Sequence, residues 1–176
     1  MAKQEIILGG GCFWCLEAVY ELLDGVEDVV SGYANGQTEN PDYRSVCSGE
    51  TGHAEVIKIT YNDKVITTDD LLEIFFDIHD PTTLNRQGAD VGTQYRSVIL
   101  YESEDVKEKA FKARDEAQMK YDAPIMTIIE PLNKFYLAES YHQDYYRQNM
   151  MQGYCMAVIS PKVLKLREKF GEKVKS

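Results

Sequence analysis

The sequence has few cysteines and histidines, which limits the metal sites and disulfides it can form. Its 176 residues include four cysteines and three histidines. A structural zinc ion needs four ligands, and no second Cys or His pair is spaced to complete a site with Cys12 and Cys15. Four cysteines also do not suggest a disulfide scaffold, so we expect catalytic or redox-active thiols in a reducing compartment and no metal or other cofactor.

Basic residues and long apolar runs are also scarce. Nineteen Lys and Arg face 29 Asp and Glu, which gives a net charge of -10. This acidity argues against nucleic acid and anionic membranes as partners. No apolar run is long enough to span a bilayer, and residues 1–5 show no signal-peptide pattern. We therefore expect a cytoplasmic protein, and a monomer is our expectation for its oligomeric state.

No internal repeat, low-complexity segment or domain linker interrupts the chain. A content of 44% hydrophobic and 27% charged residues is ordinary for a globular protein. Strand-like and helix-like patterns alternate along the sequence. We therefore predict a single domain over residues 1–176, of the α/β (α+β) class, with helices on a small sheet.

The stretch from Gly9 to Cys15 predicts a strand–turn–helix junction around Cys12. An apolar strand precedes three glycines, and apolar residues at helical spacing follow. Amide groups and the dipole at a helix N-terminus favour a thiolate, which is the nucleophilic form of cysteine. Other interpretations remain open: Phe13 and Trp14 as core residues, and Cys12 with Cys15 as a thioredoxin-like dithiol.

Glu55 is the candidate acid. Side-chain alternation in the strand 53–61 places Glu55 on the same, more apolar face as Ile57 and Ile59. Burial there would raise the pKa of the carboxyl and keep a proton available near neutral pH. A strand-end glutamate paired with a surface lysine is an equally open alternative.

Two long polar segments, residues 33–43 and 81–95, are typical either of functional loops or of plain surface connections. We expect Cys47 to be a buried spectator, because most free cysteines are buried. A strand is predicted over residues 95–101. Thr68 is the expected N-cap of the helix that begins directly after Thr68.

The remaining predictions concern the C-terminal third. Residues 138–145 suit a helix, in which His142 is more typical of a structural histidine than a catalytic one; His79 is interpreted in the same way. Cys155 is expected in a glycine-led loop. Ser160–Pro161 predicts a helix start, and the end beyond Gly171 is expected to fray.

Several separated motifs resemble one known family. They are GGGCFW from Gly9, GYANG from Gly32 with NPDY from Asn40, SGETGHAEV from Ser48, NRQGADVGTQYRS from Asn85, and GYC from Gly153. Together, and in this order, they resemble the A-type peptide methionine sulfoxide reductases. The resemblance implies a two-layer sandwich of ferredoxin-like topology, with long active-site loops and an irregular C-terminal segment, residues 150–176.

The resemblance also implies a set of site residues. It makes Cys12 the nucleophile and Glu55 the acid. Donors to the sulfoxide oxygen would be Tyr43 and Tyr95. Substrate binding would fall to Phe13, Trp14 and Asp90, with the two aromatic rings around the substrate methyl group and Asp90 on the substrate backbone.

The implied reaction reduces the S epimer of methionine sulfoxide in oxidised peptides and proteins, and repairs them. Cys12 becomes a sulfenic acid and then a disulfide, which thioredoxin reduces as the external reductant. Cys155 occupies the place of the family's usual resolving cysteine, whereas many members have Gly where this chain has Cys15. From loop mobility we favour Cys155 as the resolving thiol, with Cys15 acting second by exchange.

Two alternatives come from other classes. A dithiol–disulfide exchanger would use Cys12 and Cys15 and would transfer no oxygen from a sulfoxide. A metal-binding module would bind zinc in the purified protein. Both leave Glu55, Tyr43 and Tyr95 without a role.

Overall fold

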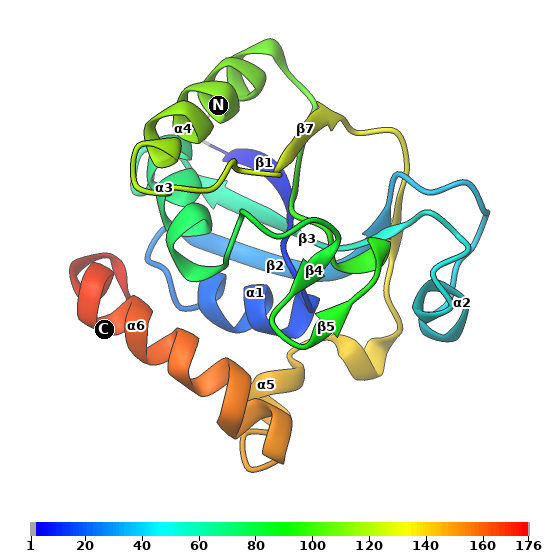
Figure 1. Ribbon diagram of the computed structural model, residues 1–176. Coiled ribbons are helices and arrows are strands. Elements are labelled where there is room, and N and C mark those ends of the chain that lie inside the picture. The colour runs from blue at the N-terminus through cyan, green and yellow to red at the C-terminus, as the bar shows by residue number, and fades with distance from the viewer. Residues whose placement is uncertain (1–2, 176) are drawn as a thin grey trace.

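The computed structural model describes residues 3–175, which form a six-stranded mixed sheet with helices packed on it (Figure 1). The strands are β1 (Lys3–Gly9), β2 (Val26–Ala34), β3 (Ala54–Asn62), β4 (Arg86–Gln87), β5 (Asp90–Val91), β6 (Val98–Tyr101), β7 (Ile128–Pro131) and β8 (Phe135–Leu137). The α-helices are α1 (Phe13–Tyr20), α2 (Tyr43–Cys47), α3 (Thr68–Ile78), α4 (Glu104–Gln118), α5 (Tyr145–Gln148) and α6 (Ser160–Phe170).

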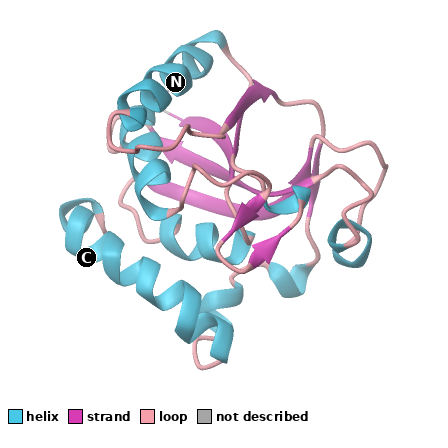
Figure 2. Cartoon of the chain, in the orientation of Figure 1, coloured by secondary structure: helices cyan, strands magenta, loops and turns pink. Residues whose placement is uncertain are grey.

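The strand order confirms the predicted ferredoxin-like topology. The sheet runs β7-β6-β1-β3-β2-β8, and its four central strands come from two interleaved βαβ units, β1-α1-β2 and β3-α3-β6. Neighbouring central strands are antiparallel. At the edges, β7 runs parallel to β6 and β8 antiparallel to β2. The short strands β4 and β5 form a separate hairpin beside the sheet (Figure 2).

The main core lies between the sheet and its helices. Ile57, Ile59 and Tyr61 of β3 face this core and are fully buried, together with apolar residues of α1, α3 and α6. Val56 points to the opposite face, where a smaller cluster is covered by Leu132 and Phe135. Side-chain alternation in β3 therefore decides what surrounds each of its residues, Glu55 included.

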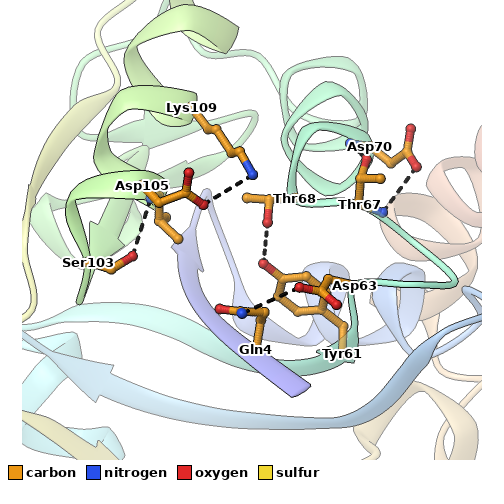
Figure 3. A network of polar contacts seen from close by, with 10 residues as sticks. Gln4, Tyr61, Asp63, Thr67, Thr68, Asp70, Ser103, Asp105 and Lys109 are labelled. Atoms are coloured by element: carbon orange, nitrogen blue, oxygen red, sulfur yellow. Dashed lines mark hydrogen bonds and ion pairs between the residues drawn. The ribbon is translucent and has the colours of Figure 1, made fainter. Parts of the chain in front are cut away.

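Polar contacts lie at the end of β3 and at the starts of α3 and α4 (Figure 3), and one of them joins β3 to α3. The Tyr61 hydroxyl and the Thr68 hydroxyl are hydrogen-bonded at 2.5 Å inside the core. The helix cap is Thr67 rather than the expected Thr68: the Asp70 N–H donates to the Thr67 Oγ1 at 3.0 Å in a capping box. Thr68 is the first helical residue, and its side chain is used for the contact with Tyr61.

Several local predictions were wrong at element ends. Tyr95 closes a 3-10 helix, Thr93–Tyr95, and the strand begins at Val98. The predicted helix over 138–145 is broken, because Asp144 has a φ of 54° and separates the 3-10 helix Ser140–His142 from α5. The helix start at Ser160–Pro161 is confirmed.

The chain end is also more ordered than expected. The 3-10 helix Gly171–Lys173 continues from α6, and Val174 forms a β-bridge with Leu23. Within residues 3–175, none of the helices combines the length and the apolar character needed to cross a membrane.

Candidate active site

Cys12 occupies the turn between β1 and α1. It is the N-cap residue of α1, with extended backbone angles of φ -67° and ψ 131°. Gly11 has a φ of +87°, and a Cβ there would lie 2.7 Å from the Gln87 side chain, so glycine suits this turn. The Gly11 N–H donates to the Tyr95 carbonyl oxygen at 3.1 Å. The predicted strand–turn–helix junction is confirmed, and it is tied to the segment that carries Tyr95.

Glu55 lies beneath the first turn of α1. Its residue exposure is 1%, and its Oε1 accepts a hydrogen bond from the Phe13 N–H at 3.2 Å. Burial raises the pKa of Glu55 to about 8, against the lowering effect of the Phe13 N–H. The carboxyl is therefore mainly protonated at neutral pH. The predicted burial of the Glu55 carboxyl is confirmed, and pairing with a surface lysine is excluded by this burial.

The Cys12 thiol is not stabilised as a thiolate in this state, so that expectation was wrong. Cys12 is 8% exposed, and burial raises the pKa of its thiol well above the ordinary value; negative charge on Glu55 and Cys15 adds to the rise. The Trp14 N–H at the helix start lowers the pKa, but burial outweighs it. Burial therefore holds Cys12 in its thiol form.

Aromatic rings surround this turn. Phe13 is fully buried, and its ring lies 5.6 Å from that of Tyr33. Trp14 is partly buried and stacks on Tyr145, with 3.7 Å between ring centroids and 8° between planes. The Trp14 Nε1–H donates to the His142 Nδ1 at 3.1 Å. Phe13 is thus a core residue at the start of α1, and Trp14 is held in orientation by contacts with the C-terminal third.

His142 and His79 make contacts that are typical of structural histidines. His142 is 1% exposed, and burial lowers its pKa, so its ring is neutral and accepts from Trp14. His79 contacts the Phe75 carbonyl oxygen and the Ser97 hydroxyl, and burial lowers its pKa to about 4. Within residues 3–175, no hydrogen bond connects either ring to the Cys12 thiol. Neither histidine is therefore placed to exchange a proton with it directly.

Tyr43 and Tyr95 both lie near enough to Glu55 for its charge to act on their hydroxyls. Tyr43 is the first residue of α2, and its N–H donates to the Glu139 Oε2 at 2.9 Å. Burial raises the pKa of both tyrosines, and negative charge on Glu55 raises them further. Both hydroxyls therefore stay protonated and available as hydrogen-bond donors.

Cys47 was wrongly expected to be buried. It is exposed, at the last position of α2. Partial burial raises the pKa of its thiol, whereas the hydroxyls of Tyr43 and Tyr95 act to lower it. The thiol thus lies beside the two tyrosines, a neighbourhood that no local pattern in the sequence predicts.

Asp90 joins the site through a residue that sequence reasoning missed. It begins β5, and its Oδ2 accepts a hydrogen bond from the Tyr154 hydroxyl at 2.8 Å. The same hydroxyl lies 3.7 Å from the Cys15 Sγ. The GYC motif contains Tyr154, but nothing in its spacing indicates a contact with a residue 64 positions away.

The two possible resolving thiols differ in their placement. Cys15 is at the third position of α1, and its N–H donates to the Cys12 carbonyl oxygen at 3.1 Å, so the two residues share one helical turn. Cys155 is fully buried at the start of a π-helical turn, Cys155–Ile159, and not in a mobile glycine loop. All four cysteines are free. The glycine-led loop on which the choice of Cys155 rested is therefore replaced by a helical turn in this structure.

Metal coordination has no support from this geometry. Across residues 3–175, no three His, Cys, Asp or Glu side chains are grouped so that they could hold a metal ion. What the site does combine is a thiol, a protonated carboxyl, two tyrosine hydroxyls and an aromatic wall.

Sequence comparison decides the family. The family described as "Peptide methionine sulfoxide reductase" matches residues 4–174. The chain belongs to the peptide methionine sulfoxide reductase family. The reductase is 58% identical to the peptide methionine sulfoxide reductase MsrA of Leptospira borgpetersenii over 172 residues, which cover 98% of this chain and 97% of the relative.

Solved structures agree with this assignment. Mxr1 from Saccharomyces cerevisiae in its reduced form has a TM-score of 0.83 and 43% identity, covering 88% of the reductase and 90% of Mxr1. Mxr1 in complex with Trx2 has a TM-score of 0.60 and 34% identity, covering 82% and 85%. The fold is thus that of an enzyme family with solved members.

Proposed function

We propose that this chain reduces the S epimer of methionine sulfoxide in oxidised peptides and proteins, and so repairs them. The observation that carries the proposal is the protonated Glu55 carboxyl, buried under the turn that holds Cys12 and linked to it through the Phe13 N–H. A sulfoxide needs a nucleophile at sulfur and a proton at oxygen. Cys12 and Glu55 supply these two groups from one pocket.

The reaction begins when Cys12, held as a thiol in the free enzyme, loses its proton to solvent, and the resulting thiolate attacks the sulfoxide sulfur and forms an S–S bond with it. The S–O bond breaks as Glu55 gives its proton to the oxygen, and hydrogen bonds from Tyr43 and Tyr95 stabilise the charge that develops there. The sulfoxide is reduced by two electrons to methionine. The released hydroxide attacks the Cys12 Sγ, the S–S bond breaks with its electron pair on the methionine sulfur, and Cys12, oxidised by two electrons, is left as a sulfenic acid.

Substrate positioning falls to three further residues. Phe13 and Trp14 form the apolar wall for the methyl group, and stacking on Tyr145 fixes the Trp14 ring. The Asp90 carboxylate accepts a hydrogen bond from the substrate backbone. Epimer selectivity follows from this three-point arrangement, because exchanging oxygen and methyl on sulfur would put the polar oxygen against the aromatic wall.

We place Cys15 first in resolving the sulfenic acid. It shares the first helical turn with Cys12, whereas Cys155 is buried and must leave its helix to react. The Cys15 thiol displaces water from the Cys12 sulfenic acid and forms a disulfide. Once the C-terminal segment, residues 150–176, detaches, the Cys155 thiol attacks the Cys12–Cys15 disulfide. This thiol–disulfide exchange forms a new disulfide between Cys155 and one of the two cysteines.

Thioredoxin is the proposed external reductant. Mxr1, a structural relative, has been solved in complex with Trx2. Thioredoxin reduces the disulfide that includes Cys155. Cys12, Cys15 and Cys155 are then thiols again, and the cycle needs no bound cofactor. We also propose that the chain acts as a monomer in the cytoplasm, as one domain.

The test measures NADPH consumption with thioredoxin, thioredoxin reductase and each epimer of N-acetyl-methionine sulfoxide separately. Turnover with the S epimer and none with the R epimer is expected. Equal turnover of both epimers would refute the stereochemical assignment. Reduction of a protein disulfide with no methionine formed would instead favour the dithiol exchanger built on Cys12 and Cys15.

A further inference from the structure

Tyr154 connects the site to the segment that carries Cys155. Its hydroxyl donates to the Asp90 Oδ2 at 2.8 Å and lies 3.7 Å from the Cys15 Sγ. Its ring meets the Trp14 ring edge-on, with 5.9 Å between centroids and 77° between planes. One side chain of the C-terminal segment therefore touches a proposed substrate-binding carboxylate, a proposed resolving thiol and the aromatic wall.

We infer that Tyr154 is a latch: its hydroxyl occupies Asp90 in the free reduced enzyme, and the substrate backbone must displace it. This inference rests on the role proposed for Asp90 in substrate binding. A carboxylate can accept several hydrogen bonds, so the inference is specific to one oxygen: the substrate N–H takes the place of the Tyr154 hydroxyl at the Asp90 Oδ2, and binding a peptide breaks the contact that holds Tyr154 in place.

The position of Cys155 gives the latch a second consequence. Cys155 is the next residue in the chain, is fully buried, and begins the π-helical turn that leads into α6. Releasing Tyr154 removes a polar anchor immediately before this turn. Binding of a peptide sulfoxide therefore loosens the segment from which Cys155 must emerge, so this second thiol is freed when substrate is bound.

Two sulfoxide probes separate the latch from a general change in the pocket. N-acetyl-methionine-S-sulfoxide N-methylamide carries backbone amides that can reach Asp90. Dimethyl sulfoxide has the reacting S–O group and methyl groups but no N–H. With dithiothreitol as reductant, Tyr154→Phe should lower KM for the amide probe about fivefold, the order of one hydrogen bond. KM for dimethyl sulfoxide should stay at the wild-type value, because the Phe ring keeps the contact with Trp14.

Tyr146→Phe is the matched control. Its hydroxyl is hydrogen-bonded to the Ser160 hydroxyl at 2.6 Å, within the C-terminal third and away from Asp90. This variant should leave both KM values unchanged. An equal fall in KM for both variants would overturn the latch, as would an unchanged or raised KM for the amide probe in Tyr154→Phe. A raised KM would mean that Tyr154 orients Asp90 for the substrate.

Alkylation of Cys155 by iodoacetamide, followed by peptide mass spectrometry, tests the latch without turnover. Tyr154→Phe should increase the alkylation rate of Cys155 about fivefold over wild type, again the order of one hydrogen bond. An unchanged rate would overturn the inference. If wild type reduced neither sulfoxide, the proposed function would fail while this readout still decided whether Tyr154 holds the segment.

Discussion

Replacing Glu55 by Gln should remove activity and, at alkaline pH, add stability. Gln keeps the size of the side chain and an oxygen that accepts the Phe13 N–H bond, which is 3.2 Å long in wild type. It cannot give a proton to the sulfoxide oxygen. The rate of methionine formation at pH 7 should therefore fall about 10²–10⁴-fold, the usual contribution of general acid catalysis.

The stability gain follows from the buried carboxyl. The pKa of Glu55 is about 8 in the folded protein against an ordinary value of 4.5. Its contribution is fully favourable below pH 4.5 and is lost as the pH rises to 8, because the unfolded chain releases the proton first. From pH 5 to pH 8 wild type should lose about 3 kcal/mol of unfolding free energy through this group.

Urea denaturation of both proteins at pH 5, 6, 7 and 8 measures this difference. The unfolding free energy of Glu55→Gln should fall about 3 kcal/mol less than that of wild type over the range. Titration of other groups is common to both proteins and cancels in the comparison. Parallel pH dependences would refute the raised pKa, and an unchanged rate of methionine formation would remove Glu55 from the acid role.

Three further changes test other parts of the account. Cys12→Ser should abolish methionine formation in a folded protein, and near wild-type turnover would refute the nucleophile assignment. Gly11→Ala should lower the unfolding free energy by about 1–3 kcal/mol and should also lower turnover, because the φ of +87° and the Gln87 side chain leave no room for a methyl group. Gly171→Ala is the control in urea denaturation, because the space around Gly171 is open. Glu17 is 1% exposed, and burial raises its pKa to about 7, so Glu17→Gln should lose about 2 kcal/mol less stability than wild type between pH 5 and 8. Equal slopes would contradict this last expectation.

Local patterns predicted the parts of the site that lie close together in the sequence. Three glycines between an apolar strand and a helical pattern predicted the Cys12 turn. Alternation in β3 predicted the buried face of Glu55, because side-chain direction in a strand depends only on position. The helix start at Ser160–Pro161 likewise depends on the fixed φ of proline.

Long-range contacts account for what the sequence left out. The Tyr154–Asp90 bond joins residues 64 positions apart, and the Trp14–His142 bond joins residues 128 apart. The helix predicted over 138–145 breaks at Asp144, and Tyr145 directly after the break stacks on Trp14, a contact between residues far apart in the sequence. The pKa of Cys12 was mispredicted for the same reason: the helix end is a local feature, whereas burial comes from the whole fold.

The central claim is that Cys12 takes the oxygen from the sulfoxide and passes the oxidation to a neighbouring thiol. The most direct measurement mixes reduced protein with excess methionine S-sulfoxide and no reductant, quenches at successive times, quantifies methionine and maps disulfides by mass spectrometry. We predict methionine formation accompanied first by a Cys12–Cys15 disulfide and later by a disulfide that includes Cys155. A Cys12–Cys155 bond at the earliest time would reverse the order of the thiols. Absence of methionine, or methionine formed with Cys12 still reduced, would contradict the claim.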